Sequence, residues 1–208
     1  MNMSGVTATQ ELAQVITKWP AEAHDTVLRM IEARYHYFRA MYQSAGPADF
    51  VKAFYEAFDE VQAEQVKDVS CKKGCYLCCR QNVSIFPDEA TVIADYCSEQ
   101  GIPIPKGYLK EQLKYDWKEV AKTEAGWCVF LTNGLCGIYP VRPLTCRKYH
   151  VVSAPELCDT VKYPADQGFN VSVPIFTIPE IEASAYCGVL SKKGKAGRMA
   201  EMLLPYSK

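Results

Sequence analysis

The chain has 208 residues, of which 49% are hydrophobic and 23% are charged, and its formal net charge is −1. This length corresponds to one or two domains and is enough to bury an ordinary core. The balanced charge excludes the basic footprint of a typical nucleic-acid-binding protein, and no apolar run reaches the ~18–20 residues that a membrane helix needs. The N-terminus lacks a secretory pattern, so we expect a cytoplasmic protein that contacts neither nucleic acid nor membrane.

Cysteines divide the chain into two parts. Nine of the ten lie between Cys71 and Cys158, and the residues before Cys71 contain none. A local content of about 10% cysteine is typical of a cross-linked or metal-bound scaffold. We therefore predict a helical N-terminal segment at 1–68 and a cysteine-rich metal-binding region at 69–208, which can still form one compact domain.

The first part has the apolar periodicity of amphipathic helices. One stripe ends at Trp19 before Pro20, and the third begins at Phe50. The stripes, in chain order, are Leu12, Val15, Ile16 and Trp19; Leu28, Ile31, Tyr35, Phe38 and Tyr42; and Phe50, Phe54, Ala57, Phe58 and Val61. Spacings of three and four residues predict three helices that pack as a hairpin or small bundle, with the stripes facing inward.

Four thiols follow within nine residues. They are Cys71, Cys75, Cys78 and Cys79. Soft thiolates select zinc, cuprous copper or iron–sulfur clusters, and a short loop reduces the entropy cost of gathering them. Because neighbouring side chains tend to point apart, we expect one cysteine of the Cys78–Cys79 pair to serve a second site, to bridge two metals or to stay free.

Shorter elements are predicted further along the chain. A helix begins at Pro87 and ends at Gly101, and another spans 108–120. Segments 127–131 and 135–139 flank Asn133-Gly134, the sequence of a tight β-hairpin turn. The β-forming residues of 170–178 predict an edge strand, and 179–187 predicts a short helix.

The hairpin supplies two more candidate ligands, Cys128 and Cys136, one on each strand, and Cys146 and Cys158 follow. Together with the first four they make eight thiols, which suits two tetrahedral ions or one larger cluster with spare ligands. Thiolate charge needs nearby cations, which also lower thiol pKa. The cations within four residues of these cysteines include Lys72, Lys73, Arg80, Arg142, Arg147 and Lys148.

The order of these motifs resembles the YkgJ-like cysteine-cluster family. It runs Cys-x3-Cys-x2-Cys-Cys, Cys-x-Phe-Leu, then Leu-Cys-x-Ile-Tyr-x-x-Arg-Pro-x-x-Cys-Arg and a last cysteine, over residues 71–158. The resemblance implies a zinc- or iron-chelating domain with these ligands: Cys71, Cys75, Cys78, Cys79, Cys128, Cys136, Cys146 and Cys158. A related domain in flagellin lysine-N-methylases implies a link to methyl transfer, although we find no glycine-rich nucleotide motif here.

Residues outside this pattern have simpler interpretations. We expect Cys97 and Cys187 to be buried structural thiols, and His150 to lie beside the metal site or at the surface. The basic stretch Lys192, Lys193, Lys195 and Arg198 is typical of a solvated loop. The spacing Cys71-x3-Cys75-x2-Cys78 also occurs in radical S-adenosylmethionine enzymes, but the strand–helix alternation of their barrel is missing.

We therefore predict a mainly α-helical α+β protein, with an N-terminal helical hairpin or bundle packed on an irregular cysteine-rich core that carries a small β-hairpin. The favoured function is thiolate binding of zinc or iron, with zinc preferred, in a structural role or in recognition of a protein or small-molecule partner. The alternative is an iron–sulfur or iron-dependent redox or methyltransferase-type enzyme. A disulfide-stapled exported protein is the third hypothesis.

Overall fold

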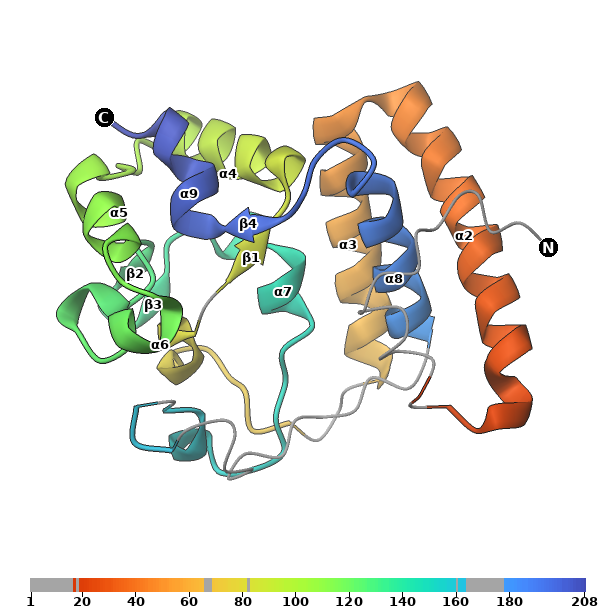
Figure 1. Ribbon diagram of the computed structural model, residues 1–208, viewed down its shortest axis with the longest axis horizontal. Helices are drawn as coiled ribbons and strands as arrows, with labels where there is room; N and C mark the ends of the chain where they lie inside the picture. Colours follow the sequence, from red (N-terminus) through yellow and green to blue (C-terminus); the bar gives the residue numbers. More distant parts are fainter. Residues whose placement is uncertain (1–16, 18, 66–68, 82, 160, 164–177) are drawn as a thin grey trace. The chain divides into compact units, whose positions relative to one another are not determined.

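The computed structural model describes residues 17, 19–65, 69–81, 83–159, 161–163 and 178–208. The chain is mainly helical and carries two small antiparallel sheets of two strands each, which confirms the predicted fold class (Figure 1). It divides into two compact units. The helical unit comprises the described parts of 1–65 and 174–195, and the cysteine-rich unit comprises those of 66–173 and 196–208.

The helical unit is built on the predicted hairpin of two long helices. A 3-10 turn, η1 (Ala21–Ala23), leads into α2 (His24–Ala45), and α3 (Pro47–Gln65) returns after a single residue, Gly46. Gly46 has a φ of +86°, a backbone conformation that favours glycine. The predicted stripe residues Leu12, Val15 and Ile16 lie outside the described residues.

An aromatic core joins these helices to a third, α8 (Ile178–Leu190). Tyr186 of α8 is fully buried, and its ring stacks on Phe54 with 3.9 Å between centroids. Phe38 and Phe50 complete the cluster with edge-on contacts. Outside the predicted stripe, α3 also buries Val51 and Tyr55, whereas the predicted core residue Ala57 is exposed.

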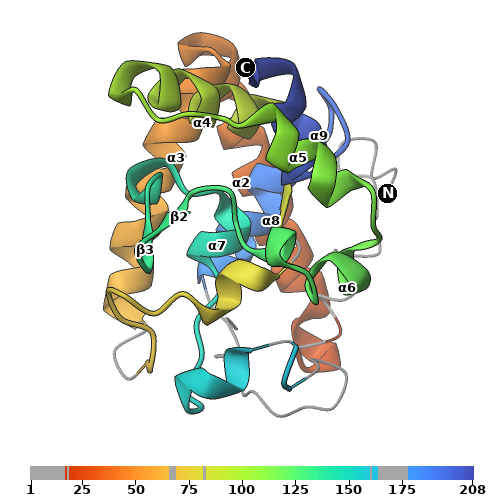
Figure 2. The same ribbon diagram turned by 90° about the vertical axis from the view of Figure 1, so that its left-hand side faces the viewer.

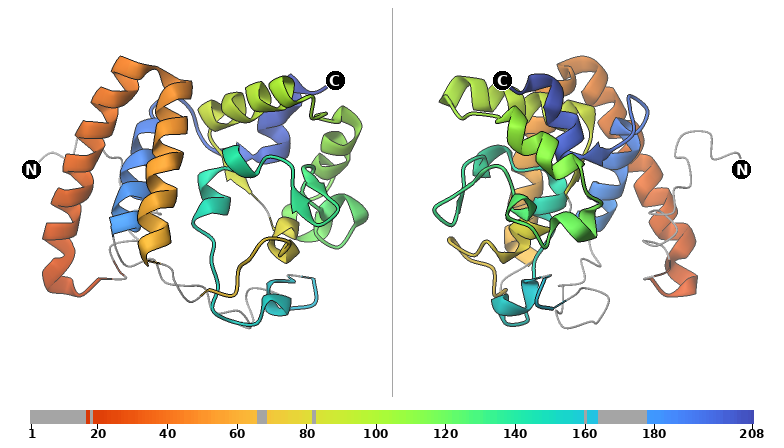
Figure 3. Two further views of the ribbon diagram at one scale, coloured as in Figure 1. Left: turned by 180° about the vertical axis from the view of Figure 1, so that it is seen from behind. Right: turned by 60° about the vertical axis from the view of Figure 1, so that its left-hand side comes forward.

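Helix α8 begins within one residue of the predicted helix at 179–187 and ends three residues later. It lies alongside α2 and α3 (Figure 3). An ion pair of 2.7 Å between Arg34 Nε and Glu182 Oε1 also links α2 to α8. Our sequence division assigned this segment to the cysteine-rich region, but its aromatic and aliphatic side chains pack in the helical unit.

The cysteine-rich unit has its own core, formed by three helices. They are α4 (Pro87–Gln100), α5 (Lys106–Leu113) and α9 (Met199–Leu203), which gather together in Figure 2. Strand β1 (Ser84–Ile85) pairs with β4 (Gly197–Arg198), bringing the C-terminal segment to α4. Fully buried side chains fill this core: Ile85, Val92, Ile93, Leu109 and Leu203.

The predicted helix at 108–120 is two helices in the structure. α5 ends at Leu113, and α6 (Trp117–Val120) begins after Asp116. The Asp116 carboxylate accepts hydrogen bonds from the backbone N–H groups of Lys118 and Glu119, at 2.8 and 2.9 Å. This N-cap starts a new helix, and the apolar pattern alone did not reveal the break.

The predicted hairpin is present, with shorter strands. β2 (Leu131–Thr132) pairs with β3 (Leu135–Cys136), and Asn133 and Gly134 have φ values of +52° and +73°. Positive φ at both central residues is the geometry for which Asn-Gly is favoured. The predicted strand at 170–178 lies almost entirely outside the described residues, and only Ile178, the first residue of α8, is described.

Within the described ranges, none of the helices combines the length and the apolar character that crossing a bilayer requires.

Candidate metal centre

The first four predicted ligands lie in a loop and a short 3-10 helix. Gly74, with a φ of +87°, forms a turn in which the N–H of Cys75 donates to the Lys72 carbonyl at 2.9 Å. The helix η2 (Leu77–Arg80) then carries Cys78 and Cys79. All four cysteines are half-buried. Tight turns rather than a long helix therefore bring these thiols into one small region.

A backbone hydrogen bond ties Cys128 to this segment. The N–H of Cys128 donates to the carbonyl of Cys79 at 2.7 Å. Cys128 precedes β2 by three residues and belongs to a turn closed by the Leu131 N–H, so the prediction that it lies on a hairpin strand is wrong. Cys136 does lie on a strand, β3. The physical reason is the turn at 128–131, which shortens β2.

Cys146 lies on the single-turn helix α7 (Leu144–Arg147), which a buried carboxylate fastens in place. Glu89 is 2% exposed and accepts hydrogen bonds from the N–H groups of Phe86, at 2.9 Å, and Leu144, at 3.1 Å. It therefore joins the start of α4 to the start of α7. The position of Glu89 three residues after the N-cap, Phe86, was the available sequence signal for a capping role.

Cys158 comes from a further 3-10 helix, η5 (Pro155–Cys158), which contacts η2. Its side chain is buried. The preceding chain is paired with the start of the cysteine loop, since the Ser70 N–H donates to the Val151 carbonyl at 2.8 Å and the Ser70 hydroxyl donates to that of Val152 at 3.2 Å. These bonds place Cys158 beside the Cys71 segment.

The eight thiols fall into two electrostatic groups. Within each group, ionisation of one thiol raises the pKa of others, and such coulombic influence decreases with distance. The first group contains Cys79, Cys128, Cys136 and Cys146. The second group contains Cys71, Cys75, Cys78 and Cys158. Segments up to 87 residues apart in the sequence therefore share one region of the cysteine-rich unit.

Cys78 links the two groups. Its charge also raises the pKa of Cys128, Cys136 and Cys146. A side-chain hydrogen bond from Cys79 and the nearby Arg142 guanidinium lower the pKa of Cys78 from 9.0 to about 7. The expectation that the Cys78 and Cys79 side chains point apart is therefore wrong. They lie in a 3-10 helix, where consecutive side chains diverge less than in a strand.

Burial has the opposite effect on the other thiols. It raises the pKa of Cys128 to about 12 and that of Cys158 to about 11, and it also raises the pKa of Cys136 and Cys146. These thiols are therefore protonated at neutral pH when no metal is bound. Because thiolates are the ligating species, metal binding at this cluster must release protons.

The two arginines of the Arg-Pro element have different tasks. Arg142 lowers the pKa of the thiols of Cys78, Cys136 and Cys146. Arg147 is 2% exposed and instead donates hydrogen bonds to the carbonyls of Arg142, at 2.7 Å, and Pro140, at 2.6 Å. Arg142 thus supplies positive charge to the cluster, and Arg147 holds the loop that carries it.

The donors fit a thiophilic ion in their chemistry, because grouped soft thiols select zinc or iron. Their placement is looser than a closed coordination shell. Among the residues that the structure describes, no three His, Cys, Asp or Glu side chains stand close enough together to hold a metal ion. All ten cysteines are free thiols. The structure therefore brings the predicted ligands into one neighbourhood, and metal binding would require the thiols to move closer together.

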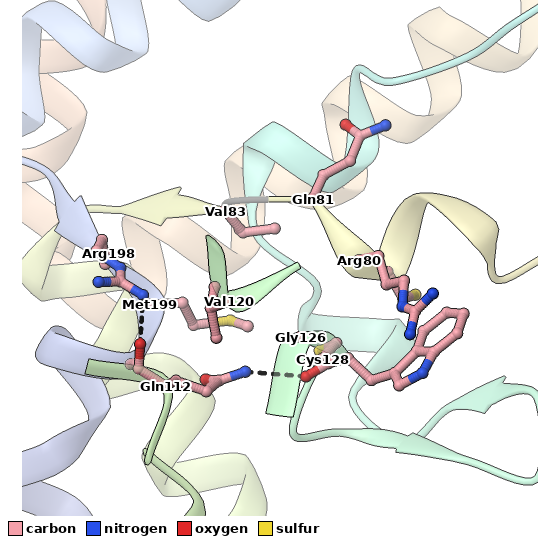
Figure 4. Close-up of a pocket in the computed structure, with 12 residues that line it drawn as sticks. Arg80, Gln81, Val83, Gln112, Val120, Gly126, Cys128, Arg198 and Met199 are labelled. Atoms are coloured by element: carbon pink, nitrogen blue, oxygen red, sulfur yellow. Dashed lines mark hydrogen bonds between the residues drawn. The ribbon is translucent and has the colours of Figure 1, made fainter. Parts of the chain in front are cut away.

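Two hollows reach the cluster at Cys128. One is shown in Figure 4, where Arg80 lies over the Trp127 ring, with 4.3 Å between the guanidinium carbon and the ring centroid. Its wall is held by Gln112, which donates to the Trp127 carbonyl at 2.9 Å, while Arg198 donates to the Gln112 carbonyl at 2.7 Å. The second hollow, of about 320 Å³, is also lined by Trp127 and Cys128. Cys128 therefore forms part of the wall of both hollows.

Three further residues singled out from the sequence are Cys97, Cys187 and His150. Cys97 is buried in α4, and burial raises its pKa to about 11, as expected of a structural thiol. Cys187 lies in α8 of the helical unit and is half-buried, which corrects the expectation of a fully buried side chain. His150 is half-buried, next to the segment paired with Ser70, and its role stays a prediction.

Comparison with known proteins bears on this region. The model of the CxxCxxCC family, described as a putative zinc- or iron-chelating domain, matches residues 70–165. No curated protein and no solved structure matches the chain. The matched residues contain all eight clustered thiols. Residues 70–165 thus match the model of a putative zinc- or iron-chelating domain, which confirms the resemblance seen in the cysteine pattern.

Proposed function

We propose that the cysteine-rich unit binds two zinc ions, each through four thiolates. The observation that carries this proposal is the division of eight thiols into two groups of four that meet at the adjacent residues Cys78 and Cys79. One ion would take Cys71, Cys75, Cys78 and Cys158, and the other would take Cys79, Cys128, Cys136 and Cys146. Four sulfur ligands in tetrahedral geometry are typical of structural zinc sites.

The proposed role of the metal is to hold together loops that have little regular structure of their own. The ligands lie on short turns and single-turn helices, so the segments that carry them depend on contacts between distant parts of the chain. In zinc peptides, structural zinc contributes about 10–16 kcal/mol of apparent binding free energy to folding. The surface fixed in this way would recognise a protein or small-molecule partner. In this proposal the thiols stay reduced, which suits a cytoplasmic protein.

The hollows that reach Cys128 support a second candidate function. A candidate metal ligand beside a hollow suits an open coordination position, which is typical of catalytic rather than purely structural metal sites. In this alternative the cluster holds iron or an iron–sulfur centre and serves a redox or methyltransferase-type reaction. Protein with a thiolate-bound iron–sulfur centre is coloured, whereas zinc protein is colourless, so the two candidates differ in a simple measurement.

The experiment is elemental analysis of anaerobically purified protein together with its visible spectrum. We expect two zinc ions per chain and no visible absorption. The variants Cys136→Ser and Cys158→Ser should each lose one ion, because each removes a ligand from a different group. Cys97→Ala, in the buried thiol of α4, is the matched control and should keep both.

Three results would contradict the proposal. Stoichiometric iron with visible absorption would favour the alternative function. If Cys136→Ser and Cys158→Ser each lost all the metal, a single larger cluster would replace the two sites. Protein that contains no metal after anaerobic purification, and takes up none, would reject both candidates.

A further inference from the structure

A further hollow, separate from those beside Cys128, lies in the helical unit. It has a volume of about 640 Å³ and is formed by α2, the start of α3 and the turn after α8. Its lining includes Tyr35, Arg39, Tyr42, Gln43, Lys192 and Lys193. Volumes of about 300–1,000 Å³ are usual for small-molecule sites. All of these residues belong to one unit, so the hollow is defined by that unit alone.

The charged side chains that line this hollow are all positive. Arg39 comes from α2, and Lys192 and Lys193 come from the turn after α8, so the tertiary fold brings together cations that are about 150 residues apart. Among the described residues that line the hollow, none is acidic. Cations in a concave surface concentrate the positive potential and attract anions. Sequence analysis interpreted the lysines as part of a solvated loop.

The floor of the hollow is packed and polar. Tyr35 is 2% exposed, and Gly188 of α8 lies against its ring: a Cβ at Gly188 would stand 3.2 Å from Tyr35 Cδ2. The glycine thus lets α8 approach α2 closely, which holds the tyrosine in place. Tyr42, which is 8% exposed, lies below Lys193, whose Nζ is 5.7 Å from the ring centroid. A site with a buried tyrosine and exposed cations suits a small polar ligand.

We propose that this hollow binds a small soluble phosphorylated metabolite through a diphosphate or similar polyanionic group. Three convergent cations match the multiple charges of such a group, and arginine forms bidentate hydrogen bonds with phosphate oxygens. Tyr35 also lines the hollow and carries a hydroxyl that can donate a hydrogen bond. Lysines near the last turn of a helix also complement its dipole, but this effect is confined to the terminal turn and does not account for Arg39, six residues before the end of α2.

The test is isothermal titration of the full-length, metal-loaded chain with inorganic pyrophosphate. We expect measurable binding that weakens as sodium chloride is raised. Arg39→Gln should weaken it at least tenfold, which corresponds to about 1.4 kcal/mol. Tyr35→Phe keeps the ring and should weaken it severalfold. Lys52→Gln, an exposed charge of α3 outside the hollow, is the matched control and should bind like the wild type.

Several outcomes would overturn the proposal. One is an absence of binding at millimolar pyrophosphate. Another is that the Arg39→Gln and Lys52→Gln variants bind pyrophosphate with equal affinity. Sedimentation with phosphatidylcholine vesicles that contain phosphatidic acid, without binding of pyrophosphate, would show that lipid headgroups are the source of the phosphate. Unchanged thermal unfolding of each variant shows that a loss of binding reflects the hollow and not the fold.

Discussion

The adjacent thiols Cys78 and Cys79 lead to a quantitative prediction about reactivity in the metal-free protein. Cys79 donates a side-chain hydrogen bond to Cys78, and this bond is the largest contribution that lowers the pKa of Cys78 from 9.0 to about 7. Replacing Cys79 with alanine removes the donor. The pKa of Cys78 should then rise towards its ordinary value, whereas Cys79→Ser keeps a hydroxyl donor and should preserve much of the effect.

The size of the effect follows from the thiolate fraction and the nucleophilicity. At pH 7 a thiol of pKa about 7 is about half ionised, against about 1% at pKa 9.0, a ratio of about fifty. With a Brønsted coefficient of about 0.4–0.5, a pKa lower by about two units makes the thiolate about six- to tenfold less nucleophilic. Cys78 should therefore react about five- to eightfold faster than an ordinary thiol at pH 7.

At pH 9 the order reverses. An ordinary thiol is then about half ionised and Cys78 almost fully ionised, so the thiolate fraction of Cys78 is only about twofold larger. Because its thiolate is also less nucleophilic, Cys78 reacts about three- to fivefold more slowly than the ordinary thiol. Cys79→Ala should consequently slow the reaction of Cys78 at pH 7 and speed it at pH 9.

The assay is exchange of the metal-free chain with a small disulfide reagent under anaerobic conditions. Mass spectrometry of quenched peptides follows each cysteine separately. Cys79→Ser serves as the control for the loss of a side-chain sulfur. If Cys79→Ala left the rate at Cys78 unchanged at both pH values, the hydrogen bond would not control this thiol and the reasoning would be wrong.

Three further predictions concern stability, measured by urea unfolding. Glu89→Ala should lower the free energy of unfolding by about 2–6 kcal/mol, because two buried N–H groups lose their acceptor. The control Glu99→Ala, at an exposed residue of the same helix, should change it by no more than about 0.5 kcal/mol. Equal effects of the two substitutions would contradict the role of the Glu89 hydrogen bonds. Gly126→Ala should lower the free energy of unfolding by about 1–3 kcal/mol, since the added Cβ would overlap a backbone carbonyl. The control Gly107→Ala, where the added Cβ meets open space, should raise it by up to about 0.5 kcal/mol. Unchanged stability of Gly126→Ala would refute the close approach of the backbone at this glycine. In metal-free protein, folding raises the pKa of Cys128 to about 12, so above pH 9 the folded state binds more protons than the unfolded state. The free energy of unfolding should therefore fall between pH 9 and about pH 12. Cys128→Ala should make this fall shallower, and an unchanged slope would contradict the raised pKa of Cys128.

Several parts of the fold were predictable because local signals specify them. The stripe of apolar residues from Ile31 to Tyr42 marks the buried face of α2, since a helix repeats every 3.6 residues. Asn133-Gly134 marks the hairpin, since both residues adopt positive φ. The spacings of the eight cysteines are specific enough to identify the family from the order of residue types alone. Each of these signals is contained within a short stretch of chain or in a pattern of residue types.

Other features depended on contacts between distant segments. The sequence predicted a short helix at 179–187, but only packing showed that Tyr186 stacks on Phe54 in the helical unit. Spacing indicated eight ligands, but only the fold showed that they form two groups meeting at Cys78. Likewise, no local pattern relates Arg39 to Lys193, which line one hollow because α2 and α8 pack together. Residue types and short-range periodicity determine which side chains are available, and the long-range packing of the backbone decides which of them meet.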